Sequence, residues 1–141
     1  NGKSVKASYV LKTDDEVKEQ KINMDTYSFE QLDISLGMEY ALNKKPFYID
    51  TLEIYLEETA QSEIELKEFM DAGDMQNYAI SVHALKSNSR IVGAVEMGNF
   101  AESMERSSKA GDLQYVREHH YELMDLLEKV RIEIRIYLNA Q

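Results

Sequence analysis

Apolar residues recur at helical spacing through most of this chain, from Phe29 to near the C-terminus. They follow one another at steps of three and four, the period of one face of an α-helix. Pro46 stands just before one such stripe, and proline suits the first turn of a helix. Only Glu63 clearly breaks that stripe. The two clearest stripes are Ile49, Leu52, Leu56, Thr59, Leu66 and Met70, and then Leu113, Val116, His120, Leu123, Leu127, Val130, Ile134 and Tyr137.

Two nearly identical tetrapeptides, residues 71–74 and 109–112, divide the helical pattern. Each places a glycine, which can end a helix in the left-handed conformation, before an aspartate, which can cap the next helix. Gly93 makes a further break. The pattern therefore predicts an all-α protein, an antiparallel up-down four-helix bundle with a short extra N-terminal helix, because short connections make neighbouring helices antiparallel. The predicted helices cover approximately 32–42, 46–70, 75–91, 95–109 and 113–137.

Residues 1–28 differ from the rest of the chain. Weak alternation at Val5, Ala7, Tyr9 and Leu11 gives way to a charged run over 12–21. This pattern predicts a linker or flexible tail over 1–28 and the bundle over 29–141. Because the chain begins with asparagine rather than methionine, we expect it to be a fragment of a longer protein.

Composition narrows the class of protein. The chain has 141 residues, 43% of them hydrophobic, which suffices for one core. A formal net charge of −10 argues against nucleic acid and anionic membrane partners. There is no apolar run long enough to span a membrane and no signal-peptide pattern, and cysteine is absent. These features are compatible with the cytoplasm, and we expect a cytoplasmic domain.

His83 is the most informative polar residue of the predicted 75–91 helix. At 100° per residue, it points roughly 140° away from the middle of the apolar stripe, toward solvent. Lys86 lies one turn on, at i+3. The stripe consists of Tyr78, Val82, Leu85, Ser89 and Val92, and the residues beside His83 on its own face are Gln76, Ile80, Ser87 and Arg90.

This arrangement suits acceptance of a phosphoryl group. Neutral imidazole is a good nucleophile near pH 7, and phosphoryl transfer needs little beyond in-line access and cationic stabilisation of the oxygens. Lys86 can supply the stabilising charge, while the small side chains of Ala84 and Ser87 leave the ring accessible. Partner docking is assigned to three residues of this face: Ile80, Arg90 and Gln76.

Other interpretations compete with this one. A lone surface histidine is usually inert, and a His-x-x-Lys pair is common by chance. We expect His120 in the core, His119 on the surface, and Tyr48 and Tyr55 at the core edge with hydrated hydroxyl groups. No paired Glu-x-x-His motif predicts a metal site, and no glycine-rich loop predicts nucleotide binding.

The segment His83-Ala84-Leu85-Lys86-Ser87-Asn88-Ser89-Arg90-Ile91-Val92-Gly93-Ala94 resembles the signature of histidine-containing phosphotransfer (HPt) domains of bacterial phosphorelays. The similarity extends over about residues 30–138. Ser87 departs from it, since the family usually has glycine there. The resemblance implies a four-helix bundle that exchanges a phosphoryl group with an aspartate of a receiver domain. It also implies magnesium held by that receiver, and no cofactor in this chain.

The leading hypothesis is a phosphorelay intermediate in which His83 takes a phosphoryl group from a response-regulator receiver domain and passes it on. A hybrid histidine kinase is a further expected partner, and we expect the domain to be a monomeric carrier rather than an enzyme. Two alternatives stay open. One is a helical receiver-binding or scaffold module with a non-phosphorylated histidine, and the other is the phosphate-accepting domain of a chemotaxis-type histidine kinase.

Overall fold

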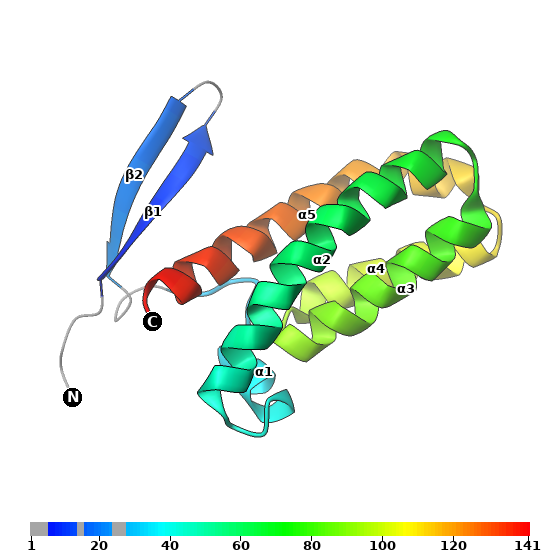
Figure 1. The fold of residues 1–141 in the computed structure, drawn as a ribbon. Helices are drawn as coiled ribbons and strands as arrows, with labels where there is room; N and C mark the ends of the chain where they lie inside the picture. The colour runs from blue at the N-terminus through cyan, green and yellow to red at the C-terminus, as the bar shows by residue number, and fades with distance from the viewer. Residues whose placement is uncertain (1–5, 14–15, 24–27) are drawn as a thin grey trace.

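Four long helices form the body of the molecule in the computed structural model, which describes residues 6–13, 16–23 and 28–141 (Figure 1). Each long helix packs against the next along the chain, and the last returns against the first. The predicted up-down four-helix bundle with a short extra helix is therefore confirmed. The elements in chain order are β1 (Lys6–Thr13), β2 (Glu16–Asn23), α1 (Ile34–Tyr40), α2 (Lys45–Asp71), α3 (Met75–Val92), α4 (Val95–Lys109) and α5 (Leu113–Asn139).

The two repeated tetrapeptides form the α2–α3 and α4–α5 connections, as predicted. Gly73 has φ +67° and Gly111 has φ +74°, both in the left-handed region. Asp74 and Asp112 then cap the following helices, each accepting a 3.1 Å hydrogen bond from the backbone N–H three residues later. These local signals determine where the helices end, so the helix boundaries follow from short stretches of sequence.

The buried faces of the helices meet in one continuous core. The predicted stripe of α3 is buried, and that of α5 is buried except for its two end members, Leu113 and Tyr137, which are half-buried. Glu63 of α2 is exposed, as its charge requires. The largest fully buried apolar and aromatic side chains are Tyr48, Leu52, Tyr55, Leu66, Tyr78, Leu85, Met97, Met104, Leu123, Leu127 and Ile134.

The prediction for Tyr48 and Tyr55 is wrong, because both rings are buried and neither hydroxyl faces water. Tyr48 Oη donates to the carbonyl of Val92 at 2.8 Å, and Tyr55 Oη lies 2.8 Å from Ser89 Oγ. Burial raises the pKa of both phenols. The partners belong to the C-terminal part of α3, so the tyrosines of α2 satisfy their hydroxyls inside the core.

His120 lies in the core, as predicted, whereas His119 is only half-buried. The Nδ1 atom of His120 is 2.9 Å from Tyr78 Oη. Burial lowers the pKa of His120, since desolvation disfavours the charged imidazolium. The ring is therefore a neutral member of the core near pH 7.

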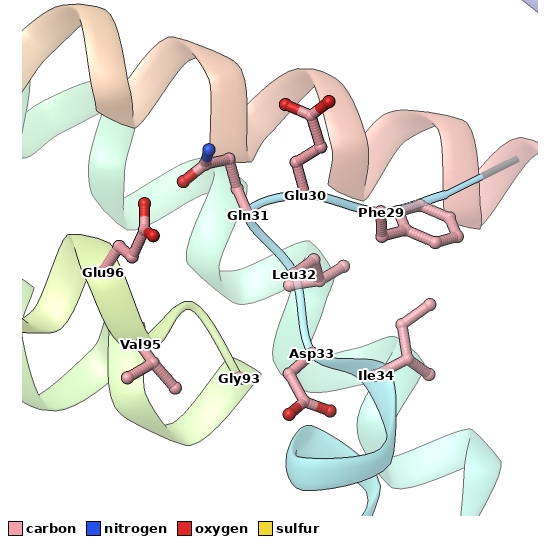
Figure 2. Close-up of a pocket in the computed structure, with 9 residues that line it drawn as sticks. All are labelled: Phe29, Glu30, Gln31, Leu32, Asp33, Ile34, Gly93, Val95 and Glu96. Atoms are coloured by element: carbon pink, nitrogen blue, oxygen red, sulfur yellow. The ribbon is translucent and has the colours of Figure 1, made fainter.

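The segment before α1 is hydrogen-bonded to two other parts of the bundle, and Figure 2 shows it beside the turn at Gly93. The buried carboxylate of Glu133, on α5, accepts hydrogen bonds of 2.8–3.0 Å from the backbone N–H groups of residues 30–32. The next N–H group, that of Asp33, donates to the carbonyl of Gly93 at 2.9 Å. Four consecutive donors thus connect this segment to α5 and to the α3–α4 turn.

Residues 1–28, for which the pattern predicts a linker or flexible tail, contain an antiparallel hairpin of β1 and β2. The pairing runs from Lys6 opposite Asn23 to Thr13 opposite Glu16, and β1 contacts α5. In the sequence, only the weak alternation of apolar residues in β1 indicated this hairpin. The charged composition of β2 gave no strand pattern, so the hairpin was not predicted. A linker role for this segment stays a prediction, and residues 1–5, 14–15 and 24–27 lie outside the described residues.

In the part of the chain that the structure describes, no helix combines the length and apolar character needed to cross a membrane. Nor do the described ranges contain a group of three or more histidine, aspartate or glutamate side chains that could hold a metal ion.

Gly93 offers a test of the connection between α1 and α3. Its φ is +93°, and an added Cβ would collide with the Asp33 carbonyl. We expect Gly93→Ala to lower the free energy of unfolding by more than about 2 kcal/mol, since backbone strain and overpacking add. Gly111→Ala is the matched control: φ is +74° and nothing lies within 4 Å, so only about 1 kcal/mol is lost. Urea unfolding measures both, and equal losses would contradict the role of this contact.

Because burial lowers the pKa of His120, the free energy of unfolding should depend on pH. The unfolded chain binds a proton near the ordinary histidine pKa of 6.5, whereas the folded protein binds it only at lower pH. Stability should therefore fall as the pH drops below about 6.5, by at most about 1.4 kcal/mol per pH unit for one proton. Urea midpoints between pH 5 and 8 should show a smaller slope in His120→Phe, while His119→Phe keeps the wild-type slope. An unchanged slope in His120→Phe would exclude this origin.

Candidate functional site

His83 lies on the outer face of α3, on the side opposite to the buried stripe of that helix. Its side chain is 56% exposed, while its neighbours Val82 and Leu85 are buried. The solvent-facing position predicted from periodicity is therefore correct. Burial of the opposite side of α3 sets the direction in which the imidazole projects.

Glu105, on α4, is the central partner of His83. Its side chain is only 5% exposed, and its Oε2 lies 2.6 Å from His83 Nδ1. Lys86 Nζ contacts Oε1 at 2.6 Å, and Lys109 Nζ contacts Oε2 at 3.0 Å. One nearly buried carboxylate thus joins the histidine to two lysines, one from each helix.

The protonation state of Glu105 follows from these contacts. Burial by itself raises the pKa of the carboxyl, but hydrogen bonds from Lys86, Lys109 and His83 outweigh it and lower the pKa to about 2. The group is therefore ionised at neutral pH and can only accept hydrogen bonds. The proton in the His83–Glu105 contact belongs to Nδ1 of the ring.

That hydrogen bond selects one tautomer of His83. A neutral imidazole has one N–H and one nitrogen with a free lone pair. With the proton held on Nδ1 by Glu105, the lone pair is on Nε2. The ring thus combines a fixed orientation with a nucleophilic nitrogen on an exposed side chain.

A groove of about 650 Å³ opens beside this cluster. Met75, Ala79 and Ile80 of α3 give it an apolar wall, and His83 and Lys109 also contribute to its lining. Lys86 and Lys109 with the Glu105 carboxylate leave one net positive charge beside the imidazole. In a chain of net charge −10, this is a local site suited to an anionic group.

The other predicted site residues occupy different positions around the ring. Gln76 and the highly exposed Ile80 line the groove. Ala84 is exposed and Ser87 is half-buried, and neither belongs to the groove lining. The assignments of all four residues to access or docking stay predictions.

The side chain of Arg90, which was predicted as a docking residue, extends from α3 to α4. Its guanidinium contacts Asn99 Oδ1 at 3.3 Å and Glu102 Oε2 at 3.4 Å. Gly98 makes this possible, because a Cβ there would come within 2.7 Å of Arg90 Cγ. In this arrangement, Arg90 connects the two helices beside the site.

Glu105 and Lys109 had no predicted role in the site. Glu105 follows the buried Ala101 by four residues and precedes the buried Ser108 by three. A carboxylate on a buried helix face needs a cationic or hydrogen-bonding partner, which was the available signal. The identity of that partner could not be read from α4 alone.

A second hollow, of about 410 Å³, lies near the other end of α3, at Gly93 (Figure 2). Ten residues of helix separate it from His83, or about 15 Å at 1.5 Å per residue. Its lining contains no histidine or lysine. It is therefore not part of the His83 cluster.

The site geometry predicts that Glu105 controls the tautomer of His83. Glu105→Met keeps a side chain of similar length but removes the acceptor, so the ring should lose its preference for the Nδ1–H form. Long-range ¹H–¹⁵N NMR spectra of the imidazole distinguish the two forms. Glu102→Met, on the same helix but paired with Arg90, should leave the wild-type tautomer. An unaltered Nδ1–H signal in Glu105→Met would refute the assignment.

The chain is similar to known proteins both in its sequence pattern and in its fold. A family model described as Hpt domain matches residues 50–133, more than half of the chain. The crystal structure of histidine-containing phosphotransfer protein B (HptB) from Pseudomonas aeruginosa PAO1 is similar, with a TM-score of 0.72 and 22% identity. The HPT domain from the Hpt sensor hybrid histidine kinase from Shewanella has a TM-score of 0.72 and 18% identity. Each alignment covers 79% of this chain and 96% of the other, and at these identities it establishes a shared fold. No curated protein matches the chain.

Proposed function

Because the chain belongs to the Hpt domain family and is a phosphotransfer module, we propose that His83 is its phosphoryl acceptor. The observation that carries this assignment is the hydrogen bond from His83 Nδ1 to Glu105, which leaves the lone pair on the other ring nitrogen. The phosphoryl donor is the aspartyl phosphate of a receiver domain. A hybrid histidine kinase is one source of such a receiver.

The transfer is a displacement at phosphorus. The Nε2 lone pair of His83 attacks, an N–P bond forms, and the P–O bond to the receiver aspartate breaks. The bonding electrons leave with the aspartate carboxylate. The reverse sequence returns the phosphoryl group to an aspartate, so the same geometry serves acceptance and donation.

Glu105 stabilises the charge that develops on the ring. Attack through Nε2 leaves Nδ1 protonated, so the imidazole becomes cationic as the N–P bond forms. The ionised carboxylate, 2.6 Å from Nδ1, lowers the energy of that cation without removing its proton. Glu105 is therefore a positioning and electrostatic residue, while His83 forms the bond.

The rest of the transfer machinery belongs to the partner. Magnesium is held by the receiver, and this domain acts as a carrier with no nucleotide site of its own. Ile80 and Gln76 form docking contacts at the groove, and Ala84 and Ser87 leave clearance for the receiver. We further assign the domain to the cytoplasm. We also propose that it acts as a monomer, since one exposed histidine suffices for exchange with a receiver.

The assignment predicts that phosphorylated receiver domains transfer label to the wild-type chain, and that the label is acid-labile and base-stable. His83→Gln should abolish the labelling, because an amide cannot accept the phosphoryl group. His119→Gln and His120→Gln are matched controls that should keep it. Label that persists in His83→Gln would refute the acceptor. Receiver binding without label in the wild-type chain would instead indicate a scaffold module.

A further inference from the structure

The two lysines that share Glu105 differ in their freedom to move. The Lys86 side chain is only 16% exposed, and its Nζ contacts Oε1 between α3 and α4. The Lys109 side chain is 65% exposed at the last residue of α4, and its Nζ contacts Oε2. Removing the Lys86 ammonium from Glu105 would leave a nearly buried carboxylate poorly compensated, which is costly. Lys109 can leave at much lower cost.

Lys109 is also placed on the side where a phosphoryl group would be. It lines the groove together with His83, whereas Lys86 lies outside that lining. Its Nζ and His83 Nδ1 contact the same oxygen, Glu105 Oε2, at 3.0 and 2.6 Å. The ammonium is therefore a direct neighbour of the ring on a long, rotatable side chain.

Phosphorylation of His83 changes the charges of the groups that contact Glu105 Oε2. The phosphorylated ring keeps its Nδ1 proton and becomes cationic, so Oε2 gains a stronger partner in His83 itself. The carboxylate then no longer needs both lysines for charge compensation. At the same time, a group with negatively charged oxygens appears on Nε2 of His83, a residue that lines the groove.

We infer that Lys109 is the phosphoryl-binding cation of this domain: it moves from Glu105 to the phosphoryl oxygens when His83 is phosphorylated, while Lys86 stays as the anchor of Glu105. This inference rests on the proposed function. It differs from the expectation drawn from the sequence, in which Lys86 supplies the charge that stabilises the phosphoryl group. Lys109 thereby stabilises both the incoming phosphoryl group and the phosphohistidine.

A direct test phosphorylates the 141-residue chain with potassium phosphoramidate, which needs no receiver. The Nε2 lone pair attacks phosphorus, the P–N bond of the donor breaks, and ammonia leaves with the electron pair. ³¹P NMR then follows the titration of the phosphohistidine. We expect Lys109→Gln to slow labelling about five- to tenfold. It should also raise the pKa of the phosphoryl group by about 0.5–1 unit, the effect of losing one nearby cation.

Three variants make this result specific. Lys109→Arg should restore most of the wild-type rate and titration, because the charge is kept. Arg106→Gln removes an exposed cation of the same helix that pairs with Glu102, and should change neither readout. Lys86→Gln should lower the melting temperature but shift the phosphoryl titration less than Lys109→Gln does.

The outcomes separate the two hypotheses. If the wild-type chain is labelled on His83 but Lys109→Gln behaves like wild type, or like Arg106→Gln, the role of Lys109 is refuted and the proposed function stands. A larger titration shift in Lys86→Gln than in Lys109→Gln also refutes it. If the wild-type chain takes no label, or His83→Gln keeps it, the proposed function fails and the inference fails with it.

Discussion

The carboxylate of Glu105 lies between α3 and α4 and is shared by an imidazole and two ammonium groups. Its near burial would by itself oppose ionisation, and its three donors reverse that effect, so the charge persists at neutral pH. An ionised acceptor holds the proton of His83 on Nδ1 and leaves Nε2 with the lone pair. The free lone pair on Nε2 and the orientation of the ring therefore both depend on the contact between His83 and Glu105.

The helix that carries His83 is held by other contacts at its C-terminal end. Tyr48 donates to the Val92 carbonyl, and the backbone of Asp33 donates to the Gly93 carbonyl. Carbonyls at a helix C-terminus otherwise lack intrahelical partners. Glu133 extends this support by fixing the segment that supplies Asp33. A histidine on an exposed face thus projects from a helix whose register and end are fixed by buried polar contacts.

The charge around His83 is opposite in sign to the net charge of the chain. The chain carries a formal charge of −10, which disfavours the approach of anions to most of its surface. Around His83, two lysines and one carboxylate leave a net positive charge beside an apolar groove. The two lysines therefore favour an anionic group at this groove, although the chain as a whole is negatively charged.

The sequence alone determined the features that depend on neighbours a few residues apart. Helix ends followed from glycine and aspartate in the connections, and the exposure of His83 followed from the 3.6-residue period, because both arise within one helix or turn. The hairpin of β1 and β2 gave too weak an alternation to be predicted. Tertiary structure decided the remainder, such as Tyr48 reaching Val92, 44 residues away, and Glu105 reaching His83, 22 residues away. Such pairs depend on the rotation and height of one packed helix against another, which the spacing within either helix does not specify.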